Sequence, residues 1–134
     1  MGMLSSTPAK IQFGPEAPAF GSWRWLGADL AASLANRYQV TTYGHEVELA
    51  DVMVIIKFLP ALGVLRELRR TRRIIFCPLD VYGSTSEIDA DAGRLLLCDR
   101  IVVHCERLTR YFRSYAPVVA LPHHVKYIAN ILPE

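Results

Sequence analysis

Short apolar segments alternate with longer amphipathic ones along most of the chain. The segment 51–57 (DVMVIIK) is almost continuously apolar, which is typical of a central strand in a parallel sheet that is covered on both faces. After Ser22, which can cap a helix, Leu26, Leu30 and Leu34 recur every four residues and form one helical stripe. The same pattern predicts strands over 10–13, 39–43, 51–57, 73–77, 101–104 and 117–121, and helices over 22–37, 60–70, 84–97 and 106–115. This alternation predicts an α/β fold, a three-layer Rossmann-like domain with a mostly parallel sheet.

Two local features qualify this arrangement. Ser84-x-x-Glu87 has the spacing of a capping box, so it marks the start of a helix. The connection from Gly44 to Ala50 is short for a helical crossover, which takes about a dozen residues. Either a single helical turn bridges it, or the strand that begins at Asp51 belongs elsewhere.

Composition limits the class of protein. The 134 residues suffice for one ordinary domain. Of these residues, 51% are hydrophobic and 21% are charged. We expect a flexible leader over 1–9, the folded domain over 10–125 and the start of a hinge or tail over 126–134. The net charge of +2 argues against nucleic acid as the main partner. Three cysteines without a CxxC pair, and no signal peptide or membrane span, favour a reducing, cytoplasmic location.

Candidate site residues follow the predicted strands. A doubly wound sheet has its ligand crevice at the carboxyl ends of the strands where the winding reverses, which we expect beside the first and fourth strands. The loop with Gly14, Glu16 and Gly21 would then face the loop with Asp80 and Tyr82. Asp80 could hydrogen-bond to a substrate hydroxyl or accept its proton. The alternative is that both loops are ordinary turns.

Polar residues also follow the last two predicted strands. His104 is the last residue of the strand 101–104 and Glu106 follows it, and His123 and His124 come after the strand 117–121. None of these has the spacing of a helical zinc motif, so we expect no metal site.

A compact basic cluster lies near the middle of the chain. Its members are Arg66, Arg69, Arg70, Arg72 and Arg73. Such a cluster can contact phosphate, an anionic lipid surface or RNA. The alternative is a solvated helix face whose side-chain stems cover apolar surface.

The assembled pattern resembles the N-terminal, acceptor-side domain of GT-B glycosyltransferases of the family 4 type, from Lys10 to about Val125. The segments that carry this resemblance are the glycine loop GPEAPAFG with its helix, DVMVIIKFLP, IIFCPLDVYG and, most specifically, CDRIVVHCERLTRYFRSYAPVVALPHHV. In that last segment the residues that fit the family's layout are Asp99, Val102, Val103, Cys105, Val118 and Pro122. Cys105 stands where the family often has a serine that caps the following helix.

The resemblance implies a function and a cleft. The acceptor would bind at Gly14, Glu16, Gly21, Tyr82, His104, Glu106, His123 and His124, with Asp80 as the candidate base. Asp80 follows Leu79 where many members have His-Asp, and the first loop lacks the usual paired glycines.

The partners follow from the same resemblance. The acceptor would be a saccharide, a lipid or a small molecule. The donor would be a nucleotide sugar, held mainly by a C-terminal domain or a separate chain, and this chain would need no cofactor of its own. The arginine cluster adds an anionic membrane surface as a partner, at the inner membrane face. We expect the chain alone to transfer no sugar. The alternative function is a small flavodoxin-like binding or interaction module without catalysis.

Overall fold

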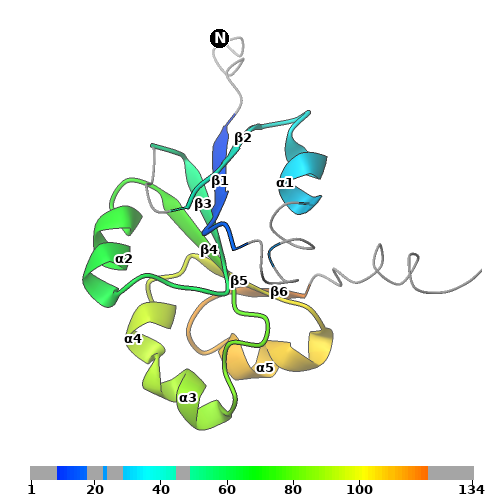
Figure 1. Cartoon of the computed structure of the whole chain (residues 1–134). Coiled ribbons are helices and arrows are strands. Elements are labelled where there is room, and N and C mark those ends of the chain that lie inside the picture. Colours follow the sequence, from blue (N-terminus) through cyan, green and yellow to red (C-terminus); the bar gives the residue numbers. More distant parts are fainter. Residues whose placement is uncertain (1–8, 18–22, 24–28, 45–48, 121–134) are drawn as a thin grey trace, which may run out of the picture.

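The fold is a single parallel sheet with helices on both faces (Figure 1). The computed structural model describes residues 9–17, 23, 29–44 and 49–120. Within these residues the strands are β1 (Lys10–Gly14), β2 (Gln39–Thr42), β3 (Val52–Ile56), β4 (Arg73–Cys77), β5 (Arg100–Val103) and β6 (Val118–Ala120). Every neighbouring pair is parallel. The predicted α/β fold and all six predicted strands are therefore confirmed, with ends that shift by at most one residue.

The helices form two layers of unequal size. They are α1 (Asp29–Leu34), α2 (Leu62–Arg69), α3 (Thr85–Ala90), α4 (Ala92–Leu95), the 3₁₀ helix η3 (Glu106–Leu108) and α5 (Thr109–Phe112). The larger layer packs Leu65 of α2, Leu95 of α4 and Phe112 of α5 against one face of the sheet. On the other face, α1 and Trp23 pack against β1 and β3. Figure 1 shows α1 on the opposite side of the sheet from the other helices.

The strand order places the reversal of winding next to β1. The order is β2-β1-β3-β4-β5-β6, so β3 lies between β1 and β4. Our expectation that the first and fourth strands flank the reversal was wrong, because β3 pairs with β1 on the side opposite to β2 and so separates β1 from β4. The parallel pairing of Ile11 with Val52 confirms that the strand after Asp51 belongs to the sheet despite that short connection.

Burial of the central strands depends on the face. Val54, Ile55, Ile74 and Val103 are buried, as the continuous apolar runs predict. The runs also predict burial of Val52, Ile75 and Val102, but these three are only half-buried. They face the α1 side, where in the described residues α1 is the one helix that covers the sheet.

Two aspartates fix the amino edge of the sheet. The Asp51 carboxylate accepts a hydrogen bond from the backbone N–H of Lys10 at 2.8 Å, and the Asp99 carboxylate accepts one from Ile74 at 2.8 Å. Each residue precedes its own strand and satisfies an amide of the neighbouring strand. The acidic residue before β5, Asp99, therefore has a physical role: its carboxylate accepts a hydrogen bond from a backbone N–H at the edge of the sheet ladder.

Helix starts follow local capping chemistry. Ser84 Oγ accepts a hydrogen bond from the Glu87 N–H at 3.2 Å, so the predicted helix start is confirmed. The Glu87 carboxylate accepts a hydrogen bond from the Gly83 N–H at 2.9 Å, one residue before the N–H of Ser84 that a capping box uses. The single helix expected over 84–97 is divided at Asp91 into α3 and α4. Cys105 makes no side-chain cap hydrogen bond, and the helix after it begins as the 3₁₀ turn η3. Cys105 is thus the N-cap residue by position, but it lacks the side-chain hydrogen bond that a serine can make, which fits the weakness of sulfur as an acceptor.

No helix in the described part of the chain has the length and apolar character needed to cross a membrane. The expected leader and the expected hinge or tail lie almost wholly outside the described residues.

Candidate functional site at the carboxyl edge of the sheet

Three ionisable side chains lie at the carboxyl ends of three adjacent strands. Lys57 follows β3, Asp80 comes shortly after β4, and His104 follows β5. The Lys57 Nζ atom lies 3.0 Å from Asp80 Oδ1, and His104 acts electrostatically on the same carboxylate. Parallel strands bring their carboxyl ends to one edge, which is where open α/β sheets bind ligands. We call this group the Lys57–Asp80–His104 cluster.

The backbone at this edge adopts an uncommon conformation. Lys57 has a φ of 70° and Leu79 has a φ of 53°, although neither residue is glycine. The Lys57 N–H donates to the Cys77 carbonyl at 2.8 Å, so the strained residue is anchored on the neighbouring strand. Left-handed conformations of this kind cost about 1–3 kcal/mol each and occur preferentially at functional sites. The turns after β3 and β4 are thus held in shapes that bring Lys57 and Asp80 together.

Electrostatics keep Asp80 ionised. The hydrogen bond from Lys57 lowers the pKa of Asp80 most strongly, burial opposes this effect, and electrostatic interactions with Lys57 and His104 lower the pKa further. The Asp80 side chain is 78% exposed, whereas that of Lys57 is 17% exposed. The Asp80 carboxylate is therefore exposed to solvent, while the Lys57 side chain that pairs with it is largely buried. Such an arrangement can accept hydrogen bonds from ligand hydroxyls.

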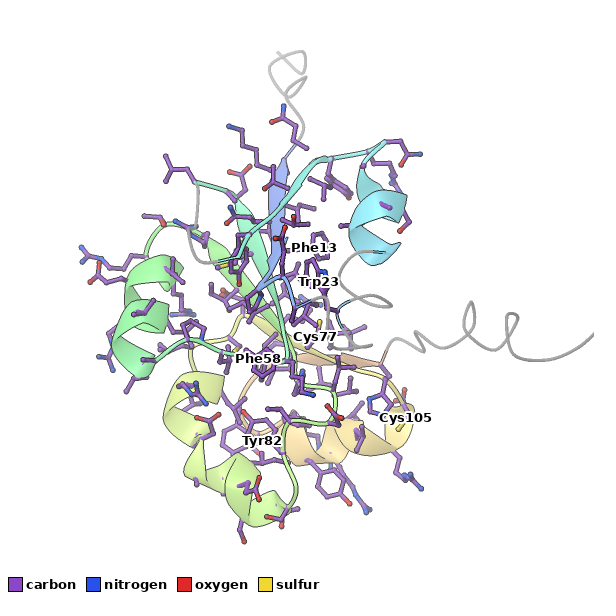
Figure 2. The ribbon with its side chains drawn as sticks, viewed as in Figure 1. Phe13, Trp23, Phe58, Cys77, Tyr82 and Cys105 are labelled. Carbon is purple, nitrogen blue, oxygen red and sulfur yellow. The ribbon has the colours of Figure 1, made fainter. Side chains whose placement is uncertain are left out.

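Tyr82 serves the helical layer rather than this cluster. Its hydroxyl donates to Asp91 Oδ2 at 2.6 Å, and its ring packs 5.9 Å from the Phe112 ring and 6.5 Å from the Phe76 ring, centroid to centroid. Figure 2 shows Tyr82 within the layer of helices. Burial and the hydrogen bond with Asp91 raise the pKa of Tyr82, so its phenol stays protonated. These contacts give no support to the expected role of Tyr82 in the cleft.

Arg94 connects that helical layer to the loop after β3. Its guanidinium donates to both oxygens of Asp91, at 2.7 and 2.8 Å, and to the carbonyls of Leu59 and Pro60, at 2.9 and 3.1 Å. Leu59 is two residues from Lys57, and Asp91 also holds Tyr82 in the loop region after β4. One arginine thereby ties together the segments that carry Lys57 and Asp80.

The first loop makes its contacts with β2. A side chain at Gly14 would place its Cβ 2.5 Å from the Tyr43 ring, so only glycine fits there. The Glu16 carboxylate accepts a hydrogen bond from the Thr42 hydroxyl, and the Glu16 N–H donates to the Tyr43 carbonyl at 2.7 Å. Gly14 and Glu16 thus join the ends of β1 and β2, while the three members of the cluster follow β3, β4 and β5.

The remaining expected site residues are dispersed or undescribed. Glu106 is exposed and is the first residue of η3, two residues after His104. Gly21, His123 and His124 lie outside the described residues. In the described ranges no three His, Cys, Asp or Glu side chains gather closely enough to hold a metal ion. Burial raises the pKa of both Cys77 and Cys98 to about 12, so these thiols are poor nucleophiles.

Sequence reasoning missed Lys57 and Arg94. Lys57 was assigned to the strand 51–57 as its last residue, yet a lysine that closes an otherwise apolar strand is a signal for a charged group at the ligand edge. The role of Arg94 had no comparable signal, since its partners Leu59 and Pro60 are more than thirty residues away.

Comparison of the chain with protein-family models, with curated proteins and with solved structures gave no significant match.

Proposed function

We propose that this chain is the acceptor-binding half of a glycosyltransferase, which moves a sugar from a nucleotide-sugar donor to a hydroxyl group of an acceptor. The observation that carries the proposal is the Lys57–Asp80–His104 cluster at the carboxyl edge of a parallel sheet. The similarity of the segments 74–83 and 98–125 to acceptor-side domains supports the same assignment. The acceptor class is a saccharide, a lipid or a small molecule with a free hydroxyl.

In this proposal Asp80 binds and orients the acceptor hydroxyl. Its exposed carboxylate accepts a hydrogen bond from the acceptor hydroxyl, and the ion pair with Lys57 holds the carboxylate in place. The hydroxyl oxygen forms a bond to the anomeric carbon of the donor sugar as the bond from that carbon to the nucleotide diphosphate breaks. The hydroxyl proton passes to Asp80. Because the pKa of Asp80 is lowered, the carboxylate is a weak base, and the proton moves only as the attacking oxygen becomes acidic.

The donor is assigned to a different part of the machinery. A C-terminal domain or a separate chain holds the nucleotide, so the chain alone is expected to transfer no sugar. A cytoplasmic location belongs to the proposal as well, because nucleotide sugars are used there and because Cys77, Cys98 and Cys105 are all free thiols.

Acceptor binding by the chain itself tests the proposal. A panel of saccharides and polyols is titrated into ¹⁵N-labelled protein, and amide shifts are mapped by nuclear magnetic resonance. We expect saturable shifts at Lys57, Asp80 and His104, and weaker binding by Asp80→Asn. Glu67→Gln is the matched control, since the Glu67 carboxylate is similarly exposed, at 72%, but lies on α2. Absence of shifts across the panel, or equal affinity of Asp80→Asn, would count against the proposal.

A second candidate is a flavodoxin-like binding module without catalysis. The strand order favours it, because β2-β1-β3-β4-β5 is the flavodoxin-like order, with the reversal between β1 and β3. In that case a ligand binds between the loops after β1 and β3 instead of at Asp80. Shifts confined to residues 14–17 and 57–59, with none at Asp80 or His104, would select this module.

A further inference from the structure

An aromatic side chain lies beside the Lys57–Asp80–His104 cluster. Phe58 follows Lys57 directly after β3 and is 40% exposed. Figure 2 shows it next to Cys77, which ends the neighbouring strand β4. The Lys57 Nζ atom lies 5.7 Å from the centroid of the Phe58 ring and 3.0 Å from Asp80 Oδ1. The ring and the carboxylate are therefore neighbours of the same ammonium group.

A tight turn after β3 fixes the position of this ring. The Phe58 N–H donates to the Ile56 carbonyl at 2.7 Å, and Lys57 between them has a φ of 70°. This hydrogen bond and this φ together define a γ-turn of the rare form with positive φ, which is strained for any residue with a side chain. The Lys57 N–H is anchored on the Cys77 carbonyl. The backbone thus holds Lys57 and Phe58 at the carboxyl edge of the sheet.

The core does not account for Phe58. The next residue, Leu59, packs against the larger hydrophobic cluster, whereas Phe58 belongs to neither of the two clusters that the described residues form. Exposure by itself indicates no ligand, because isolated apolar side chains are common on protein surfaces. The feature that needs an explanation is an exposed aromatic ring at the ligand edge, beside a carboxylate that is 78% exposed.

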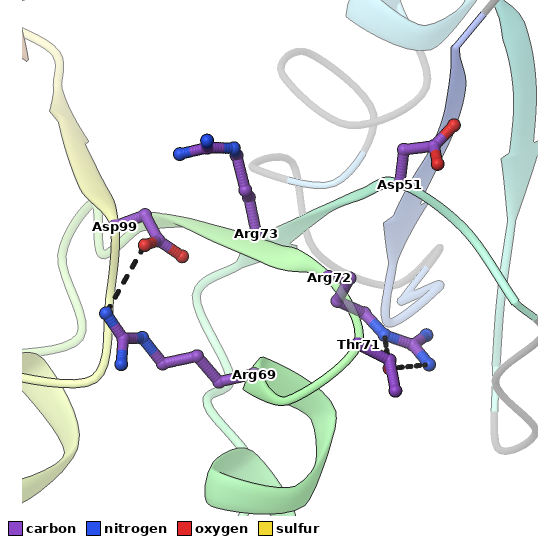
Figure 3. Close-up of a pocket in the computed structure, with 6 residues that line it drawn as sticks. All are labelled: Asp51, Arg69, Thr71, Arg72, Arg73 and Asp99. Atoms are coloured by element: carbon purple, nitrogen blue, oxygen red, sulfur yellow. Dashed lines mark hydrogen bonds and ion pairs between the residues drawn. The ribbon is translucent and has the colours of Figure 1, made fainter.

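The amino edge of the sheet presents a different surface. The open space there is lined by Asp51, Arg69, Thr71, Arg72, Arg73 and Asp99 (Figure 3). Arg69 forms an ion pair of 3.4 Å with Asp99, and Arg72 donates to the Thr71 hydroxyl at 3.0 Å. Figure 3 shows the guanidinium groups of Arg72 and Arg73 pointing away from each other. Of the two edges, it is the carboxyl edge whose described residues combine an exposed aromatic ring with an exposed carboxylate.

This combination matches the chemistry of a cyclic saccharide. The C–H groups of a sugar ring form an apolar face, and its hydroxyl groups lie around the rim. An aromatic ring packs against such a face, because its negative π-surface attracts the weakly positive C–H groups. A carboxylate accepts hydrogen bonds from the hydroxyl groups. An acyclic polyol has the hydroxyl groups without a fixed apolar face, and a lipid alcohol has an apolar chain without the rim of hydroxyl groups.

We propose that the acceptor is a saccharide and that Phe58 is the residue that selects it. The exposed part of the Phe58 ring packs against the C–H face of the sugar, while Asp80 accepts a hydrogen bond from one of its hydroxyl groups. Lys57 stays paired with Asp80 between the two contacts. This inference rests on the proposed function, since it names the acceptor class of the same site.

Matched pairs of cyclic and acyclic ligands test the inference. The methyl glycosides of glucose, galactose and mannose, and the corresponding alditols, are titrated into the ¹⁵N-labelled chain. We expect at least one methyl glycoside to bind about tenfold or more tightly than its alditol, with saturable amide shifts at Lys57, Phe58 and Asp80. The alditol is the matched ligand, because it keeps the hydroxyl groups and lacks the rigid ring.

Substitutions at position 58 separate the ring from the carboxylate. Phe58→Ala should weaken binding of that glycoside about tenfold and leave alditol binding unchanged, whereas Phe58→Tyr should keep the affinity within about threefold, since it retains the ring. Leu62→Ala is the control, because Leu62 is similarly exposed, at 38%, but lies at the start of α2. It should change the affinity less than about twofold. Thermal unfolding of each variant verifies that the fold is intact.

The outcomes distinguish this inference from the proposed function. Equal affinity of glycoside and alditol, or a Phe58→Ala variant that binds the glycoside as the wild type does while Asp80→Asn loses it, overturns the inference alone. An equal loss in Leu62→Ala and Phe58→Ala overturns it as well. Glycoside binding that is lost in Phe58→Ala but unchanged in Asp80→Asn supports Phe58 as the selecting residue and contradicts the proposed function. Absence of binding by every ligand overturns both.

Discussion

Replacing Arg94 by methionine tests whether one partly buried hydrogen-bond network holds the site loops. The substitution keeps most of the aliphatic stem and removes the four hydrogen bonds that the guanidinium donates, two to Asp91 and two to the carbonyls of Leu59 and Pro60. The side chains of Arg94 and Asp91 are 32% and 16% exposed, so solvent screens the pair only in part. The variant leaves Asp91 with the Tyr82 hydroxyl as its remaining side-chain donor.

The expected magnitude follows from these contacts. Hydrogen bonds to charged groups contribute about 1.5–3 kcal/mol each, but bonds from one guanidinium are not additive, and water can replace some of them at a partly exposed site. We therefore expect Arg94→Met to lower the free energy of unfolding by about 2–3 kcal/mol. For a chain of this size that corresponds to a fall in Tm of roughly 10 °C.

The control for Arg94→Met is Arg70→Met, in which a lost ion pair with Glu67 lies on the surface, with both side chains 72% exposed. That loss should cost less than about 0.5 kcal/mol. Urea unfolding monitored by far-ultraviolet circular dichroism measures both variants. Equal stability of the two variants would refute the claim that Arg94 supports the loops.

The same network predicts a pH dependence. Burial raises the pKa of Asp91, but the hydrogen bonds from Arg94 and Tyr82 outweigh it, and the net effect lowers the pKa. A depressed pKa contributes stability that is present above the unfolded value, about 3.9, and is lost as the pH falls through the lower folded value. Below about pH 4 the wild type should thus lose stability more steeply than Arg94→Met. Parallel pH profiles of the two proteins would contradict this assignment.

Two further substitutions probe the site and the first loop. Lys57→Met should raise the pKa of Asp80 toward its ordinary value, because the substitution removes the strongest effect that lowers it. A ¹³C titration of the Asp80 carboxyl group measures this pKa. An unchanged pKa would mean that the ion pair between Lys57 and Asp80 does not form in solution. Gly14→Ala should destabilise the fold by about 1–3 kcal/mol, because the new Cβ would overlap the Tyr43 ring. Gly63→Ala in α2 meets nothing within 4 Å and should stabilise slightly, so a loss of stability in both variants would refute the steric argument.

The central strands were predictable because buried strands of a parallel sheet have continuous apolar runs in the sequence. Ile55, Ile74 and Val103 follow from such runs, which also require helices on both faces of the sheet. The order of the strands was less accessible. β3 pairs with β1 rather than with β2, and hydrophobic periodicity carries no information about which strands pair.

The candidate site was predictable only where it follows from strand ends. Asp80 and His104 were expected at the ligand edge because Asp80 comes after a predicted strand and His104 is the last residue of one. Tyr82 satisfies the same rule, yet its ring packs among the helices and its hydroxyl bonds to Asp91, since an aromatic side chain gains more from burial than from exposure at an edge. Lys57 lies in the site with a left-handed backbone conformation. The sequence does not indicate this conformation, because it is uncommon for residues other than glycine.

Sugar transfer by the protein encoded in the complete reading frame tests the central claim most directly. Nucleotide release from a panel of nucleotide sugars is measured with hydroxylated acceptors for the wild type, Asp80→Asn and Glu67→Gln. The account predicts transfer by the wild type, a loss of about a hundredfold or more in Asp80→Asn with an unchanged Tm, and normal turnover in Glu67→Gln. Transfer by Asp80→Asn at a near-normal rate would contradict it.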